Sequence, residues 1–514
     1  MVHPPCEMDI LLNGNGSAHG TKSQVRQPAK GTARTKVESS QRSIKENKVT
    51  FTTAGGLELR GTPIRTTRHL AVFELYDPID TPRVSEALEE LEIIFQARVI
   101  YSGRAVVRSI VDLGTNVVCE ATLNESFWKD LDPNAVRQFN GDLTREFRKF
   151  LGEWQKIHKV LPEFKEAVSE IRMFLTDLRL WLEQIELEIH SSPAIHRPQL
   201  ERAVIEQLAP QIIPVVNTLF GKFEKVAADL TEDSRPAHRN YIQRSLHQIV
   251  LCAPFANRTY KKPLGYPGDY EMVNMMSRDP QEGTSLFSKI FNVWLLEQGS
   301  AVAHRNRLRE LSAHIESEAM RVSRSGKKAR IYNFACGPAI EVQHFLENSL
   351  LGEQVEFTLA DFNSETLEHT KQVIHNIKDR LGRRTIVRFQ KKAVHQLFKD
   401  NHNIPPSRDG RIREYDFIYC AGLFDYLTDQ VCKQLLKIFH GWLAPGGQLL
   451  VTNVTPLTPN QGSLDLILDW HLIYRNAAEF EQLCSGIIPN ETIRVRSDHT
   501  GVNIFMEVRK PNDH

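Results

Sequence analysis

The last part of the chain, from Lys327 onward, alternates short apolar runs with longer stretches in which apolar residues recur every three or four positions. The short runs predict strands and the recurrence predicts amphipathic helices. Predicted strands cover residues 331–335, 355–360, 386–389, 417–420 and 449–452, and predicted helices cover 340–346, 364–381 and 429–442. Strands that alternate with helices indicate a parallel sheet, here an α/β, Rossmann-like domain over residues 327–511. Two more apolar runs, 492–496 and 502–509, have no helix between them and predict a terminal hairpin on that sheet.

Earlier in the chain the pattern changes twice. Residues 51–133 hold short runs rich in β-branched and aromatic residues, at 70–76, 97–101, 105–111 and 116–121. Breaks such as Asp77-Pro78, Ser102-Gly103 and Gly114 separate them, and the pattern predicts a small β-barrel or sandwich. Residues 134–255 predict a helical region, in which Pro210 and Pro214 break or kink one helix. Residues 256–326 are interpreted as a substrate-side cap and linker, and the polar residues 1–50 as a disordered tail.

Composition narrows the class of protein. The 514 residues are 41% hydrophobic, and Lys+Arg 64 against Asp+Glu 63 gives a net charge of +1, which argues against a dedicated nucleic-acid binder. No unbroken apolar run approaches the roughly 18 residues of a spanning helix, and the N-terminus does not resemble a secretory signal. The seven cysteines lack zinc-ligand spacing, so we expect a cytoplasmic protein with reduced thiols, no metal site and no membrane span.

The ends of the first two predicted strands carry candidate ligand contacts. Small residues from Ala335 through Gly337 to Ala339 follow the first strand, where the backbone can approach a ligand closely and the next helix offers unpaired N–H groups. Asp361 ends the second strand, where a carboxylate can accept two hydrogen bonds from a ribose diol. The same acid would serve a nicotinamide-binding fold, or simply cap the next helix, so it does not select the cofactor by itself.

Further motifs resemble those of class I S-adenosylmethionine methyltransferases. Residues 415–427 resemble the family's fourth strand and following loop, and residues 442–449 match its L-x-P-G-G turn. The sequence departs from the family at Ala339, which stands in place of the second glycine. The resemblance implies that S-adenosylmethionine is the cofactor. By that resemblance the cofactor is bound by Ala335, Gly337, Ala339, Asp361, Phe362, Lys392, Ala393, Cys420 and Ala421.

A Gly-Tyr-Pro-Gly-Asp-Tyr stretch at residues 265–270 precedes this domain. Two glycines and a proline fix an irregular backbone there, which fits either a functional loop or a rigid interdomain turn. From about Arg235 to the C-terminus the chain resembles the methyltransferase family of 3-hydroxypalmitic acid methyl ester biosynthesis. That resemblance implies that Tyr266, Asp269 and Tyr270 contact the cofactor or close the substrate pocket, and that the acceptor is a small molecule.

The nature of the acceptor decides whether a base is needed. A carboxylate with a pKa of about 4 is already ionised at neutral pH, so methylating it requires orientation and desolvation but no general base. An amine or hydroxyl acceptor would need a proton acceptor. The candidate catalytic residues are Asp269, Tyr266, Tyr426 and His471, with Asp425 as a further possible base. The apolar helix near residues 286–295 either lines an acyl tunnel or belongs to the core.

The β-rich region resembles a PilZ domain, whose family binds cyclic di-GMP. The expected R-x-x-x-R spacing is missed at Arg60 and Arg65, whereas Arg104 and Arg108 have it inside a predicted strand. A structural or oligomerisation module is the alternative for this region. Three hypotheses therefore stay open: an O-methyltransferase for a carboxylate such as a hydroxy fatty acid, a methyltransferase for an amine or hydroxyl, and a cyclic di-GMP-responsive regulator with a degenerate methyltransferase fold.

Overall fold

The computed structural model describes residues 47–75, 81–95, 98–112, 117–124, 160–402, 415–489 and 492–512. The predicted tail lies outside this range except for its last residues, which from Lys48 onward belong to a strand. The periodic pattern predicted between residues 134 and 159 also lies outside the described residues. All elements named below belong to one compact unit, Lys45–His514.

The first described region is a closed, six-stranded antiparallel barrel with the strand order β1-β2-β3-β6-β5-β4. Its strands are β1 (Lys48–Thr52), β2 (Glu58–Thr66), β3 (Leu70–Leu75), β4 (Ala87–Phe95), β5 (Arg98–Asp112) and β6 (Val117–Leu123). Alternate side chains such as Phe51, Phe73 and Tyr101 fill the interior. The barrel prediction is confirmed, but the break expected at Ser102-Gly103 is wrong, because β5 stays paired with β4 through a bulge and Gly103 lies opposite Leu91.

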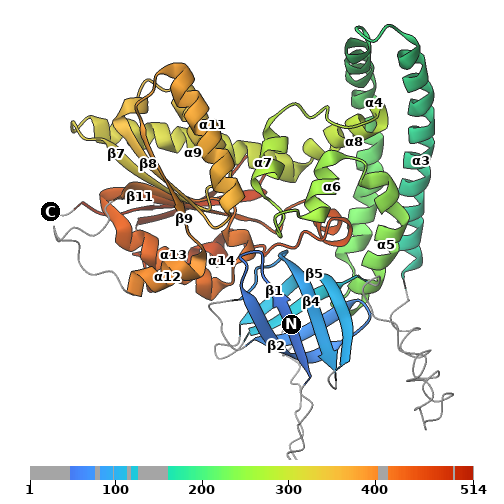
Figure 1. The fold of residues 1–514 in the computed structure, drawn as a ribbon, viewed down its shortest axis with the longest axis horizontal. Helices are drawn as coiled ribbons and strands as arrows, with labels where there is room; N and C mark the ends of the chain where they lie inside the picture. The colour runs from blue at the N-terminus through green and yellow to red at the C-terminus, as the bar shows by residue number, and fades with distance from the viewer. Residues whose placement is uncertain are drawn as a thin grey trace, which may run out of the picture. The chain divides into compact units, whose positions relative to one another are not determined.

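Seven helices follow in the described part of the chain. They are α3 (Pro162–Ser191), α4 (Arg197–Ala228), α5 (Arg235–Val250), α6 (Pro254–Lys261), α7 (Tyr270–Ser277), α8 (Leu286–Leu296) and α9 (Gly299–Ser323). Figure 1 shows α3 and α4 as a long helical pair. The apolar side of α8, with Phe287 and Phe291, packs into the core of this helical region, so α8 fits the core interpretation rather than the acyl tunnel.

Helix α4 runs without interruption through Pro210 and Pro214, where we expected a break or a kink. The neighbouring Ile212, Ile213 and Val216 are buried in the helical core, and this packing offsets the lost backbone hydrogen bonds. Within the described residues α4 is also the one helix whose length and composition would allow it to cross a membrane. A core helix passes the same test, so this is weak evidence for a span.

The C-terminal part is a seven-stranded mixed sheet with the order β12-β13-β11-β10-β7-β8-β9. Its strands are β7 (Ala329–Phe334), β8 (Val355–Asp361), β9 (Ile386–Lys391), β10 (Tyr415–Cys420), β11 (Leu443–Val454), β12 (Ile493–Ser497) and β13 (Asn503–Arg509). β7 to β11 pair in parallel, and β13 pairs antiparallel with both neighbours. The predicted parallel sheet with a terminal hairpin is therefore confirmed.

Helices cover both faces of this sheet (Figure 1). α9, α10 (Ile340–Asn348) and α11 (Ser364–Leu381) pack on one face, and α12 (Val394–His402), α13 (Asp429–Trp442) and α14 (Ala477–Gln482) pack on the other. From β7 the chain moves outward through β8 to β9 and then returns to β10 on the other side of β7. The reversal between β7 and β10 leaves a crevice at the carboxyl ends of these strands, where α/β sheets bind ligands.

Candidate functional site

A cleft lies at this reversal point and holds about 1270 Å³ of empty space, part of it open to solvent. The carboxyl ends of β7, β8, β10 and β11 form its floor, and the loop before α7, helix α9 and the segment after β11 form its walls. Among the residues that line it are Tyr266, Ala335, Gly337, Ala339, Asp361, Phe362, Ala421 and Tyr426. Tyr270 and Asp425 line it as well, so the fold brings together ten of the residues named from the sequence.

The turn after β7 has an unusual backbone. Ala335, Gly337 and Ala339 all have left-handed conformations, with φ of 59°, 52° and 50°. This conformation disfavours any side chain, yet the two alanines adopt it. The carbonyl oxygen of Gly337 accepts a hydrogen bond from Thr370 Oγ1 at 2.8 Å, which fixes the turn to α11. Nothing lies within 4 Å of the place where a Cβ of Gly337 would stand, so the turn borders open space.

We predict that Ala335→Gly is neutral or stabilises the protein by up to about 1 kcal/mol, because glycine relieves the left-handed strain. Ala329→Gly is the matched control, since Ala329 is fully buried in β7 without positive φ and should lose about 1 kcal/mol or more. Urea unfolding of both variants measures the difference. Equal destabilisation of the two variants would contradict the strain argument.

Asp361 connects the tip of β8 to this turn. Its Oδ2 accepts a hydrogen bond from the Gly337 backbone N–H at 3.1 Å, and its Oδ1 accepts one from the Asn363 N–H at 3.0 Å. Burial raises the pKa of the carboxyl group, while the two backbone donors and the Arg83 guanidinium act in the opposite direction. The carboxylate faces the cleft at the position expected for a ribose-binding acid, and it also holds the turn in shape.

Phe362 follows Asp361 and lies between two other side chains of the cleft. Its ring centroid is 5.0 Å from that of Tyr266 and 4.7 Å from the guanidinium carbon of Arg83. A second cavity adjoins the cleft here and is lined by Phe362 and Ala393, among others. Lys392 lines neither cavity, and Cys420 is fully buried in the sheet beneath Ala421. Cofactor contacts by these two residues stay predictions.

The loop that carries Tyr266 enters the cleft between two glycines in left-handed conformation, Gly265 and Gly268. Asp269, one residue further, caps α7: its Oδ1 accepts hydrogen bonds from the Met272 N–H at 2.9 Å and from Arg258 Nε at 2.8 Å. Asp269 is buried and does not line the cleft. The structure gives Asp269 this local structural role, and its catalytic role stays a prediction.

Lys262, at the start of the same loop, is a buried amine that donates a hydrogen bond to the carbonyl oxygen of Leu468 at 3.2 Å. Burial lowers its pKa to about 7, although Asp469 nearby raises it. In the unfolded chain the Lys262 amine keeps its proton up to about pH 10.4. Between about pH 7 and 10 the unfolded state therefore binds more protons than the folded state. Stability should therefore rise with pH in this window.

Lys262→Met should remove this contribution, which is at most about 1.4 kcal/mol for each pH unit. Lys261→Met is the control, because Lys261 is exposed. The free energy of unfolding in urea, measured from pH 7 to pH 10, tests the prediction. It fails if wild type and Lys262→Met show the same slope.

The floor of the cleft contains a buried acid, Glu341, in the first turn of α10. Its Oε1 accepts hydrogen bonds from Tyr419 Oη at 2.7 Å and from Asn333 Nδ2 at 3.1 Å. Burial raises the pKa of this carboxyl group, and Tyr419 and Arg307 lower it. Together with Asp361, Glu341 makes this part of the cleft suitable for a ligand that carries positive charge and hydroxyl donors.

Arg307, from α9, brings a guanidinium to the same cleft. Gly422, just after β10, has a left-handed φ of 86°, and a Cβ there would lie 3.0 Å from Arg307 Nη2, so the guanidinium packs closely against the end of this strand. Burial lowers the pKa of Arg307, and Asp425 and Glu341 oppose this. Asp425 accepts a hydrogen bond from the Val454 N–H at 2.8 Å. Arg307 thus stands between two acids without an ion pair at salt-bridge distance to either in the described residues.

His304 lies one helical turn before Arg307. Arg307 Nη2 lies 2.7 Å from His304 Nδ1, and because a guanidinium keeps its protons, Nδ1 must be the acceptor. Burial and the neighbouring arginines hold the pKa of His304 well below its usual range, so the ring is neutral and carries its proton on Nε2. Nε2 is buried with no hydrogen-bond partner among the described residues. His304 therefore offers an unused N–H donor beside Arg307.

The remaining wall of the cleft around Arg307 is mostly apolar. It is lined by Met272, Val273, Met276, Leu308, Leu311, Val454, Leu464, Trp470 and Leu472. Apolar walls with a few convergent polar groups are typical of small-molecule sites. This chamber fits an apolar molecule with one anionic or strongly accepting group.

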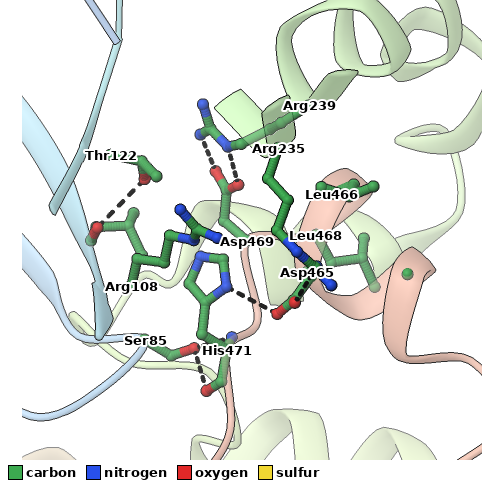
Figure 2. A network of polar contacts seen from close by, with 12 residues as sticks. Ser85, Arg108, Thr122, Arg235, Arg239, Asp465, Leu466, Leu468, Asp469 and His471 are labelled. Atoms are coloured by element: carbon green, nitrogen blue, oxygen red, sulfur yellow. Dashed lines mark hydrogen bonds and ion pairs between the residues drawn. The ribbon is translucent and has the colours of Figure 1, made fainter. Parts of the chain in front are cut away.

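Tyr426 and His471, the other two candidate bases, lie in different surroundings. Tyr426 lines the cleft, and its Oη accepts a hydrogen bond from Trp470 Nε1 at 2.9 Å. Burial raises the pKa of Tyr426 well above its usual value, outside the range of a neutral-pH base. His471 lies instead at the junction with the barrel, where its Nδ1 is 2.8 Å from Asp465 Oδ1 (Figure 2). It does not line the cleft, and its catalytic role stays a prediction.

Arg83, His304, Arg307 and Glu341 were missed in the sequence. A signal was present for two of them: His304 and Arg307 share a helical face with Leu308 and Leu311, and charged residues on a buried face need an explanation. Arg83 lies in the barrel, about 280 positions before Phe362 in the sequence. No local pattern connects the two.

The fold and the cleft together define a Rossmann-like α/β protein with an open cleft at its switch point. No protein-family model matches the chain, and no curated protein matches it. Solved structures similar to the chain include S-adenosylmethionine-dependent methyltransferases, all at low sequence identity.

Three of these structures illustrate the similarity. A possible exported protein of Bordetella parapertussis is 16% identical with a TM-score of 0.38, covering 62% of this chain and 99% of that one. The magnesium protoporphyrin IX methyltransferase of Synechocystis PCC 6803, solved with bound S-adenosylhomocysteine, is 8% identical with a TM-score of 0.32, covering 50% and 97%. An O-methyltransferase family protein of Burkholderia thailandensis is 14% identical with a TM-score of 0.30, covering 56% and 75%. At these values the function has to follow from the residues of the cleft.

Proposed function

We propose that the protein is an S-adenosylmethionine-dependent O-methyltransferase that esterifies a carboxylate on a small apolar molecule such as a hydroxy fatty acid. The observation that carries this proposal is one cleft that is lined by two chemically different sets of residues. Asp361 and the left-handed turn form the set that we assign to the nucleoside, and Arg307 and His304, with apolar side chains that line the same cleft, form the set that we assign to the acceptor.

The residues present fit the cofactor. Asp361 is available to a ribose diol, Phe362 offers an aromatic face, and the open space beside Gly337 lets a ligand approach the backbone. Glu341 gives the cleft a negative group on the side where a positively charged ligand is to be held. When bound there, S-adenosylmethionine supplies an electrophilic methyl group on a sulfonium.

Arg307 and His304 then hold the acceptor. A guanidinium with a neighbouring N–H donor is suited to a carboxylate, and the two groups would fix the orientation of its oxygens. The apolar wall excludes water from the carboxylate, which strengthens these contacts and removes the solvation that would slow the reaction. No proton has to be removed, so the high pKa of Tyr426 and the structural contacts of Asp269 do not obstruct the reaction.

The experiment is methylation by the purified full-length chain with isotope-labelled S-adenosylmethionine, analysed by mass spectrometry. Substrates are 3-hydroxy fatty acids of several chain lengths, with the alcohol and the amine of equal length as matched controls. The expected product is an alkali-labile methyl ester of the acid only. Label on a hydroxyl or an amine would favour the second hypothesis from the sequence. Absence of any product together with calorimetric binding of cyclic di-GMP would favour the regulator.

A further inference from the structure

The connection between barrel strands β3 and β4 reaches the proposed cofactor cleft. Thr81, Pro82 and Arg83 line the cavity that adjoins the cleft, and Arg83 lines the cleft itself. On the other side of this adjoining cavity stand Phe362 and Ala393, which follow β8 and β9. One wall of the cavity therefore comes from the barrel and the facing wall from the sheet.

A buried acid holds this part of the barrel in place. Glu86 accepts hydrogen bonds from the Arg83 N–H through Oε2 and from the Ala54 N–H through Oε1, both at 2.7 Å. Burial raises the pKa of Glu86, and these bonds together with the Arg83 charge act against that rise. The backbone of Arg83 is thus tied to the β1–β2 turn, which leaves its side chain directed at the cleft.

The same segment is bonded to both walls of the cleft. The Ala87 N–H donates to the carbonyl oxygen of Gly265, at 2.5 Å, one residue before Tyr266. Ser85 Oγ donates to the carbonyl oxygen of His471 at 2.7 Å, in the segment that carries Trp470 into the cleft (Figure 2). A Cβ at Gly265 would lie 2.6 Å from the Cβ of Ala54, so barrel and loop pack too closely for any other residue.

Further from the cleft, charged pairs lie where the barrel meets helix α5 and the segment around Asp469. Arg108 of β5 forms ion pairs with Glu120 of β6 and with Glu232, just before α5. Beside it, Arg239 of α5 binds both carboxylate oxygens of Asp469, each at 2.5 Å (Figure 2). The position of Arg83 relative to Phe362 is therefore supported by bonds on several sides.

We propose that the barrel is a working part of the cofactor site, in which Arg83 closes the adenosine end of the cleft and contributes to nucleoside affinity. This inference rests on the proposed use of S-adenosylmethionine. The guanidinium carbon lies 4.7 Å from the Phe362 ring centroid, so a planar cation stands beside the aromatic face at that end of the cleft. Guanidinium planes stack on flat π systems such as a phenyl ring or adenine. The Arg83 guanidinium can therefore contact both the Phe362 ring and the adenine of the cofactor.

In this proposal Arg83 contacts the nucleoside directly, so its test is a binding measurement. Calorimetry on the full-length chain should show S-adenosylhomocysteine binding about tenfold more weakly to Arg83→Ala and to Arg83→Met than to wild type. Arg83→Lys should recover part of the loss, since it keeps the charge without the planar group. Arg65→Ala is the matched control, because Arg65 is an exposed arginine of β2, and it should bind like wild type.

Two further readouts separate this role from a general structural effect. Adenosine alone should lose affinity by the same factor, and the KM of the acceptor at saturating cofactor should stay within about twofold. Arg83 variants that bind S-adenosylhomocysteine like wild type, in a chain whose wild type binds it, overturn this inference alone. A wild type that binds no S-adenosylhomocysteine overturns the proposed function instead.

Discussion

Replacing Arg307 by methionine should lower kcat/KM for the acceptor about 10²- to 10³-fold, while the dissociation constant for S-adenosylhomocysteine stays within a few-fold of wild type. Removing one charged partner from a desolvated hydrogen-bonded pair costs about 3–4 kcal/mol, and this cost falls on the group that Arg307 holds. Methionine keeps most of the side-chain length and volume, so the apolar chamber should stay filled. Steady-state kinetics and calorimetry on the same preparation separate the two effects.

Arg309→Met is the matched control, because Arg309 is exposed on the same helix and should leave both constants unchanged. His304→Phe should show the same direction as Arg307→Met with a smaller loss, since it removes one neutral N–H donor and leaves the guanidinium. If Arg307→Met loses cofactor affinity and keeps acceptor affinity, Arg307 binds the amino-acid end of the cofactor and the carboxylate acceptor loses its support.

The C-terminal sheet could be predicted from the sequence because each signal is local. Buried parallel strands read as apolar runs, and the bounds predicted for α11 and α13 match the observed ones. The turn from Ala335 to Ala339 and the acid Asp361 also follow from position, since the carboxyl ends of neighbouring parallel strands meet at one edge. Local pattern was therefore sufficient to place these residues at the cleft.

The part of the cleft that we propose for the acceptor could not be predicted in this way, because its residues come together only through tertiary packing. Arg307 reaches the cleft from a helix that precedes the sheet, and Trp470 reaches it from a segment that follows β11. The Gly-Tyr-Pro-Gly-Asp-Tyr loop made Asp269 a candidate catalytic residue in the sequence. In the structure Asp269 caps α7 and pairs with Arg258. An acid at a helix start fits both roles, and sequence alone cannot separate them.

The barrel strands could also be predicted only in part from the sequence, for a different reason. Its alternating strands were partly recognised, but β1, β2 and β4 were missed, because their apolar residues are interrupted by exposed charges such as Glu58 and Glu89. Closure of the barrel supplies the pairing partners that make these segments strands. The position of Arg83 opposite Phe362 depends on that closure, so it is visible only in three dimensions.

Replacing Asp361 by alanine should weaken binding of S-adenosylhomocysteine at least 100-fold. The variant loses a carboxylate that faces the ribose end of the cleft, and it also leaves the Gly337 and Asn363 N–H groups without their acceptor. Unsatisfied buried donors cost about 1–3 kcal/mol each, so the turn itself should loosen and the free energy of unfolding should fall. Asp361→Asn should bind almost as poorly, because one amide oxygen cannot accept from both N–H groups and its NH₂ opposes one of them.

Thermal unfolding with and without ligand separates lost stability from lost binding. Wild type should gain several degrees in Tm at S-adenosylhomocysteine concentrations far above its dissociation constant, and Asp361→Ala should gain none whatever its own Tm. Asp379→Ala, at an exposed acid near the end of α11, is the control and should keep the full gain. A ligand-dependent gain in Asp361→Ala equal to that of wild type would mean that the carboxylate at the tip of β8 does not bind the nucleoside, and the cofactor site proposed here would have to lie elsewhere.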